Sequence, residues 1–146
     1  MHSASRHIFR RACIGRRRRG IETVELALAL PVLLFVIFAG FEYGWAVLRT
    51  VQLDHAARVG AREASLHGSD AMSVEQRVLG ALEALGIDNA SITVTPADPE
   101  GASAGEAISV EVQVRYEDVQ LLGLSDFMPL PSHLRGKASM VKEPET

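Results

Sequence analysis

The chain has 146 residues, and seven of its 15 basic residues but none of its 18 acidic residues lie within residues 1–20. Residues 21–146 therefore carry a formal charge of −10, which argues against nucleic-acid binding because such binding needs cations to replace phosphate counterions. The single cysteine, Cys13, lies in the basic leader, so the chain cannot form an intramolecular disulfide.

A long apolar run follows the four arginines at 16–19, and basic residues in this place indicate the cytoplasmic side of a membrane-spanning segment. Residues 26–41 carry no charge, and the run resumes after Glu42. A helix that rises ~1.5 Å per residue covers roughly 25 Å between Glu25 and Glu42, compared with a hydrocarbon core of ~30 Å. The sequence therefore predicts a spanning helix over residues 21–48, with both acids near the interfaces.

Further features of the run bear on this prediction. Pro31 is tolerated in a spanning helix at the cost of a local kink, and Tyr43 and Trp45 are of the type enriched at membrane boundaries. A cleaved signal peptide is the main alternative, with a weak cleavage site in the sequence FAG at 38–40. A core helix of a soluble protein is less favoured, because the segment is apolar on all faces.

The start of the run has a specific spacing. Gly20 is followed by Ile21, Glu22, Thr23, Val24 and Glu25, so an acid stands five positions after a small residue that ends a basic leader. This arrangement resembles the N-terminus of type IV prepilins, in which a membrane aspartyl peptidase cuts after the glycine. The resemblance implies cleavage between Gly20 and Ile21, after which Glu25 is the fifth residue of the mature chain.

Three longer motifs narrow the resemblance. GIETVELALALPVLLF at 20–35, FEYG at 41–44 and AARVGAREAS at 56–65 together resemble the TadE-like pseudopilins of tight-adherence (Flp) pilus systems, over roughly residues 16–68. The resemblance implies a minor pseudopilin that takes part in pilus assembly in the bacterial inner membrane. It implies a single-pass chain with a cytoplasmic N-terminus and a periplasmic C-terminal domain. The implied partners are a prepilin peptidase, other pilus-assembly components and pseudopilins, with no nucleic acid and no cofactor.

Glu25 has a physical reason to serve assembly or processing. An ionised acid costs ~2.5–3.5 kcal/mol at the bilayer centre and less near an interface. Cleavage would create an α-ammonium at Ile21, and a carboxylate about 4 Å from an ammonium gains ~4 kcal/mol at an effective dielectric of 20. We therefore predict that Glu25 pairs with an α-ammonium group, the alternative being a headgroup position without a role. For Glu42, both a plain interfacial position and a function stay open.

After the span, residues 49–68 are predicted to continue as a helix. Small residues recur every four positions within 56–65, which permits close approach of another helix or packing on the chain's own domain. Ser73 and Gln76 form a capping-box pattern that predicts a second helix as far as Gly86, with one apolar face.

Strands are predicted at 91–95, at 107–116 and from 134 to 141, because apolar and polar residues alternate there. The expected fold class is α+β, in which a long N-terminal helix carries one or two helices on a three-stranded antiparallel sheet. The expected division is a leader at 1–20, a transmembrane helix at 21–48, a helical extension at 49–68 and a small periplasmic domain at 69–146.

Motifs typical of enzymes do not occur in the sequence: it contains no P-loop, HExxH, GxSxG or dinucleotide fingerprint. We therefore predict no catalytic, cofactor-binding or metal-binding residue and expect the protein not to be an enzyme. Two other interpretations stay open. One is a secreted soluble binding module released by signal peptidase near Gly40, and the other is an uncleaved membrane-anchored scaffold that keeps its arginines.

Overall fold

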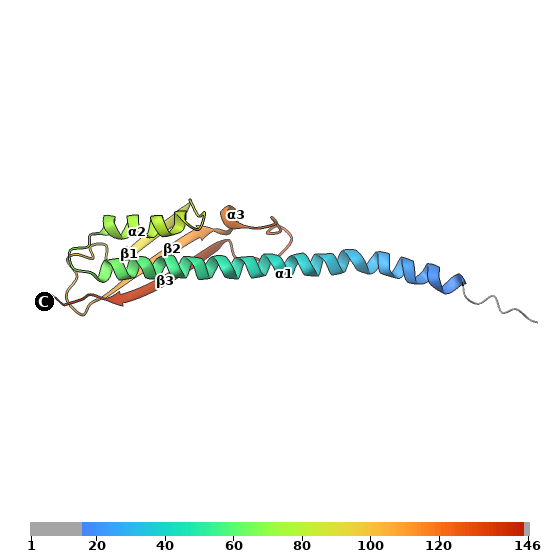
Figure 1. The fold of residues 1–146 in the computed structure, drawn as a ribbon, viewed down its shortest axis with the longest axis horizontal. Helices are drawn as coiled ribbons and strands as arrows, with labels where there is room; N and C mark the ends of the chain where they lie inside the picture. The colour runs from blue at the N-terminus through green and yellow to red at the C-terminus, as the bar shows by residue number, and fades with distance from the viewer. Residues whose placement is uncertain (1–15, 145–146) are drawn as a thin grey trace, which may run out of the picture. The chain divides into compact units, whose positions relative to one another are not determined.

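The structure is a computed structural model that describes residues 16–144, with the side chains of residues 20–144 (Figure 1). Most of the predicted leader, including Cys13, lies outside the described residues. The elements in chain order are α1 (Arg16–Ser65), α2 (Ala71–Glu83), β1 (Ala90–Thr95), β2 (Ala107–Arg115), α3 (Tyr116–Val119) and β3 (His133–Val141). Contacts divide the chain into two units, residues 1–37 and 38–146, which are described one at a time.

In the first unit, α1 is helical through Pro31, and all residues from 20 to 37 are exposed. Among the described helices, α1 is the one that is both long enough and apolar enough to cross a membrane. Its mean hydropathy is 2.5 over an apolar window of 18 residues. None of that window is buried by the rest of the chain. This exposure fits a single-pass membrane helix and contradicts the interpretation of the segment as a core helix of a soluble protein.

The second unit is an α+β domain built on a three-stranded antiparallel sheet with strand order β1-β2-β3. In the central strand, Val110 pairs with Val94 of β1 and with Ala138 of β3. The predicted alternation is confirmed, because Ile108, Val110, Val112 and Val114 are all buried while the residues between them are partly exposed. The apolar side of β2 thus forms the centre of the core.

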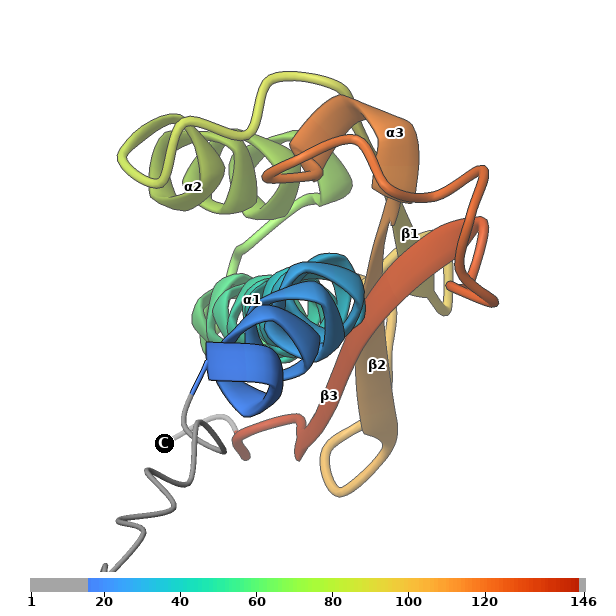
Figure 2. The ribbon, with the colours of Figure 1, turned by 90° about the vertical axis from the view of Figure 1, so that its right-hand side faces the viewer.

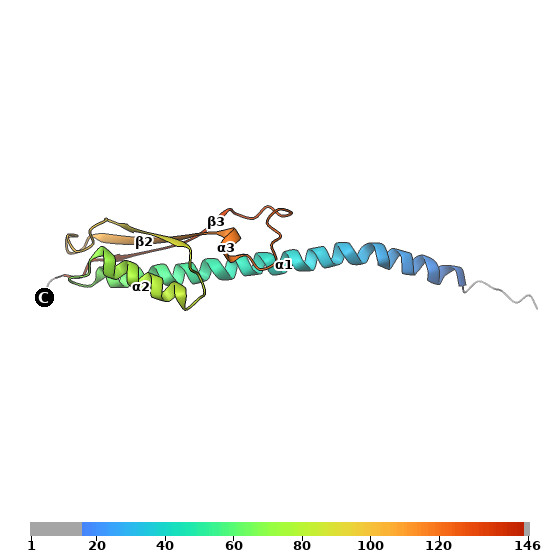
Figure 3. The same ribbon diagram turned by 90° about the horizontal axis from the view of Figure 1, so that it is seen from above.

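Residues 38–65 of α1 cover this apolar side together with α2, and both helices lie on the same face of the sheet (Figures 2 and 3). The small residues of the two predicted rows are buried here: Ala56, Ala57, Gly60, Ala61, Ala64 and Ser65. The domain therefore uses these rows for its own packing. Gly136 of β3 completes the contact, because a Cβ atom there would collide with the backbone of Leu53 and Asp54 in α1.

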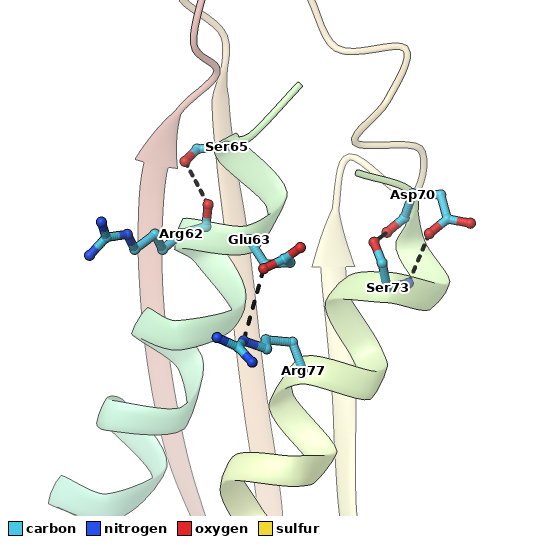
Figure 4. Close-up of polar contacts among 6 residues, drawn as sticks. All are labelled: Arg62, Glu63, Ser65, Asp70, Ser73 and Arg77. Carbon is cyan, nitrogen blue, oxygen red and sulfur yellow. Dashed lines mark hydrogen bonds and ion pairs between the residues drawn. The ribbon is translucent and has the colours of Figure 1, made fainter. Parts of the chain in front are cut away.

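The start of α2 differs from the prediction. The N-cap is Asp70, whose Oδ1 accepts a hydrogen bond from the Ser73 backbone N–H at 2.8 Å (Figure 4). The Ser73 hydroxyl donates to the Asp70 carbonyl, so the predicted capping box of Ser73 and Gln76 is wrong. The hydrogen bonds to Ser73 lower the pKa of Asp70. Near the same end of the domain, Glu63 and Arg77 pair across α1 and α2 at 3.9 Å, as Figure 4 also shows.

The predicted apolar face of α2 and the role of Gly86 at its end agree with the structure. Val74, Val78 and Leu82 form the buried face of α2, and Gly86 ends the turn after it with a φ of +66°. The predicted helical extension is helical as far as Ser65, without a break at the expected boundary between residues 48 and 49. That boundary falls inside the second unit, which begins at Phe38. The four-part division given above stays a prediction.

Close packing around Gly60 gives a stability prediction. A Cβ atom at Gly60 would collide with Val78 Cγ2 and come within 3.2 Å of a Val110 methyl, whereas one at Gly80 would meet nothing within 4 Å. Overpacking costs ~1–3 kcal/mol, and glycine inside a helix costs ~1 kcal/mol relative to alanine. Gly60→Ala is therefore expected to destabilise the full chain and Gly80→Ala to stabilise it, as measured by urea unfolding in micelles. Equal midpoints for the two variants would contradict the packing described.

Candidate functional site

The predicted cleavage site lies inside the first part of α1. Gly20 and Ile21 are both helical and exposed. A Cβ atom at Gly20 would meet nothing within 4 Å, in contrast to Gly60 and Gly136, where packing requires glycine. Glycine costs a helix ~1 kcal/mol relative to alanine. Packing within the described residues therefore does not require glycine at position 20. The role of Gly20 in cleavage stays a prediction.

Glu25 lies one helical turn after Ile21 and is exposed. Residues four apart on a helix lie on the same face. The Glu25 carboxylate is therefore within reach of the α-amino group that cleavage would create at Ile21. None of the described residues pairs with this carboxylate. An exposed acid between apolar neighbours such as Val24 and Leu28 is thus available to a partner outside the chain. Its role in assembly or processing stays a prediction.

Glu42 is a different kind of residue, because the domain encloses it completely. Its Oε1 accepts hydrogen bonds from the Tyr116 hydroxyl at 2.6 Å and from the Leu121 N–H at 3.3 Å. Its Oε2 accepts from the Leu122 N–H at 2.8 Å. Burial of a carboxylate is costly unless hydrogen bonds satisfy it, and these three donors do so. Whatever its depth relative to a membrane, Glu42 is a buried structural acceptor and does not face the headgroups freely.

Tyr116 is the donor that closes this contact from the sheet side. It follows the last residue of β2 and is buried at the start of α3. Burial raises the pKa of the Tyr116 hydroxyl, and the hydrogen bond to Glu42 raises it further. The hydroxyl therefore keeps its proton over the whole neutral range and serves as a permanent donor.

Two aromatic side chains extend the contact along α1. Trp45 Nε1 donates to the Val119 carbonyl at 2.7 Å, and the Tyr43 hydroxyl donates to the Pro129 carbonyl at 3.3 Å. Arg49 lies over the Trp45 ring, with its guanidinium carbon 4.7 Å from the ring centroid. The polar atoms of the predicted boundary aromatics are thus bonded to their own domain. Together with Glu42, they fasten residues 116–130 to one stretch of α1.

Sequence reasoning singled out Glu42 but missed its partners. Tyr116, Leu121 and Leu122 lie 74 to 80 positions away along the chain, and two of the three donors are backbone groups. The only signal was an acid within an apolar run. No group of three or more His, Cys, Asp and Glu side chains in the described part of the chain is arranged to hold a metal ion.

Comparison with known proteins agrees with the resemblance found in the motifs. No curated protein and no solved structure matches the chain. Residues 20–62 match the model of a family described as TadE-like protein. The matched segment begins at Gly20 and includes Glu25, Glu42 and four of the six small residues that pack in the domain, as far as Ala61. Over residues 20–62, the chain is thus similar to the TadE-like family that its motifs resemble.

Proposed function

We propose that the protein is a minor pseudopilin that takes part, without enzymatic activity, in assembly of a bacterial pilus of the Tad (Flp) type. The observation that carries the proposal is the TadE-like match, which starts at the glycine of the prepilin-like motif. The exposed apolar helix of residues 20–37 supports a membrane-anchored component. The partners in this proposal are a prepilin peptidase, other pseudopilins and further pilus-assembly components.

The proposed topology is a single pass through the inner membrane with the N-terminus in the cytoplasm. Seven arginines precede the span, and such a bias keeps the N-terminal side in the cytoplasm. The domain of residues 38–146 would then lie in the periplasm. The acidic charge of the chain after residue 20 is compatible with translocation, because acidic residues contribute little to orientation.

Release by signal peptidase near Gly40 is the rival proposal. Residues 38–40 lie in the interior of α1, and the helix continues without a break to Ser65. Two residues later, Glu42 is held by three hydrogen bonds to the domain. A protease needs a backbone that can unwind locally. Both candidate sites are helical, but only the site near Gly40 lies next to a residue that is hydrogen-bonded to the domain, which supports retention of the span. Among the described residues, no hydrogen bond to the domain is found next to Gly20.

Processing provides the test, and the chain offers a matched control. Gly20 and Gly40 both lie in α1, and a Cβ atom at either would meet nothing within 4 Å. With a prepilin peptidase co-expressed, the wild type and Gly40→Ile are expected to lose residues 1–20, while Gly20→Ile stays at the precursor mass because a bulky side chain blocks approach to the backbone. Mass spectrometry and N-terminal sequencing give the readout, with Ile21 as the expected first residue.

Each rival gives its own pattern in this experiment. Cleavage of the wild type and Gly20→Ile, but not of Gly40→Ile, would indicate signal peptidase and a released soluble module. The full precursor mass in all three proteins would indicate an uncleaved anchored scaffold. Either pattern would overturn the proposed processing.

A further inference from the structure

An exposed apolar surface lies in the connection between α3 and β3. It consists of Leu121, Leu122 and Phe127, whose exposed fractions are 47%, 46% and 76%. We call residues 121–127 the 121–127 loop. Gly123 turns the chain within it at a φ of +74°, and Met128 anchors its end in a buried position. Three large apolar side chains directed away from the core within seven residues are unusual for a surface that faces only water.

The level of this loop along α1 is fixed by hydrogen bonds. The N–H groups of Leu121 and Leu122 donate to the Glu42 carboxylate. Beyond the loop, Pro129 accepts a hydrogen bond from Tyr43. The loop therefore lies beside the turn of α1 that begins at Glu42.

That turn interrupts the apolar run of the predicted span, and Glu42 is the acid expected near its outer interface. Residues 26–41 are uncharged, and Phe41, the last of them, is 61% exposed. If residues 26–41 occupy the hydrocarbon, Glu42 and the loop bonded to it lie at the lipid–water boundary. Within the second unit, Phe41 and the loop bonded to Glu42 then both present exposed apolar side chains near this boundary.

We propose that the 121–127 loop inserts Leu121, Leu122 and Phe127 into the membrane interface beside the point where α1 leaves the bilayer. The inference rests on the proposed function to the extent that α1 must be retained as a span. Leucine and phenylalanine are the side chains with which interfacial segments bury ~5–10 Å into the boundary of headgroups and acyl chains. The loop would thus give the domain a second membrane contact and limit the tilting of the domain relative to the membrane.

The charge of the residues around the loop indicates whether the loop would bind lipids through headgroup charge or through apolar contact. Residues 116–132 contain three acids, Glu117, Asp118 and Asp126, and no lysine or arginine. Attraction to anionic lipids, worth ~1 kcal/mol per cation near the surface, is therefore absent. Insertion must rest on apolar contact, so zwitterionic vesicles should support it at least as well as anionic ones. Asp126 would stay at the hydrated edge of the headgroups.

A fluorescent depth probe tests the proposal on the full chain. In a Cys13→Ser background, Phe127→Cys is labelled with an environment-sensitive dye and the protein is reconstituted into phosphatidylcholine vesicles. Met72→Cys is the matched control, because Met72 is also apolar and 66% exposed but lies at the start of α2, beyond the far end of α1. Leu34→Cys, in the middle of the apolar run and 41% exposed, reports on the span itself.

The expected result is a blue-shifted emission at position 127 that is quenched by lipids carrying a spin label near the headgroup, with water-like emission at position 72. Adding phosphatidylglycerol should leave the shift unchanged or reduce it. Water-like emission at 127 together with a lipid-quenched label at 34 would overturn the loop proposal alone, while a water-like label at 34 would overturn the span on which it rests. A shift at 127 that lipid labels do not quench and that disappears on dilution into more lipid would identify a second copy as the partner and also overturn the proposal.

Discussion

Replacing Glu42 by alanine is expected to destabilise the domain by about 3 kcal/mol, because it removes the acceptor of three hydrogen bonds and leaves a cavity. The Tyr116 hydroxyl is buried with no alternative acceptor among the hydrogen bonds described for it, and the Leu121 and Leu122 N–H groups lose the partner that holds the loop. Urea unfolding of the full chain in micelles should show the loss. Trp45, the only tryptophan, reports it directly by fluorescence because its indole bonds to Val119 in the same contact.

Matched variants separate this effect from the general cost of losing an acid. Glu75 is exposed on α2, so Glu75→Ala should leave the unfolding midpoint almost unchanged. Glu42→Gln keeps the shape but presents an amide N–H₂ to one of the donors, so it should lie between the wild type and Glu42→Ala. A Glu42→Ala protein as stable as Glu75→Ala would contradict the described role of Glu42.

The same contact predicts an alkaline limit to stability. The folded protein holds the Tyr116 proton more tightly than the unfolded chain, whose tyrosine pKa is about 10. This contribution is complete below about pH 10 and is lost as the pH rises from there toward the raised folded pKa. Tyr116→Phe should remove that part of the alkaline slope. An unchanged slope in the variant would mean that another group sets it.

Much of the domain was predictable because local pattern and burial agree. The alternation in β2 predicted its buried face. The helical pattern before Gly86 predicted one apolar face for α2, which Val74, Val78 and Leu82 form. The cap of α2 was misjudged because two candidate residues, Asp70 and Ser73, stand three positions apart and each forms a hydrogen bond with the other. Short-range pattern does not say which of them lies outside the helix.

Contacts between residues far apart in the sequence could not be predicted from the local sequence pattern. The small residues around Gly60 fit equally well with packing against another subunit or against the chain's own domain, and only the position of Val78 and Val110 decides for the domain. The helix α3 was not predicted, because Tyr116 continues the alternation of β2 and four residues carry too little periodicity. The environment of Glu42 depends on backbone groups, which have no sequence signature.

Exchange of Glu25 for glutamine is expected to abolish surface pili while leaving insertion and folding intact. The amide has nearly the same shape as the carboxylate and is easier to bury, so a residue that only marks the interface would tolerate it. A residue that pairs with an α-ammonium loses at most ~4 kcal/mol of attraction before desolvation is subtracted. Because Glu25 is exposed and has no pairing partner among the described residues, the second unit of the chain should not sense the change.

Glu22→Gln is the matched control for Glu25→Gln. Both acids lie three positions apart on the exposed first part of α1, but only Glu25 stands at the fifth position after the proposed cleavage and one turn from Ile21. In a strain without the wild-type copy, membrane level, mature mass and surface pili should be compared for both variants. Normal pili with Glu25→Gln would remove the assembly role, and normal mass without pili would place the role after processing. A stronger defect from Glu22→Gln would show that Glu22 is the acid that pairs. Either carboxylate would gain the same attraction from an ammonium about 4 Å away, so only the position on the helix decides which of them pairs.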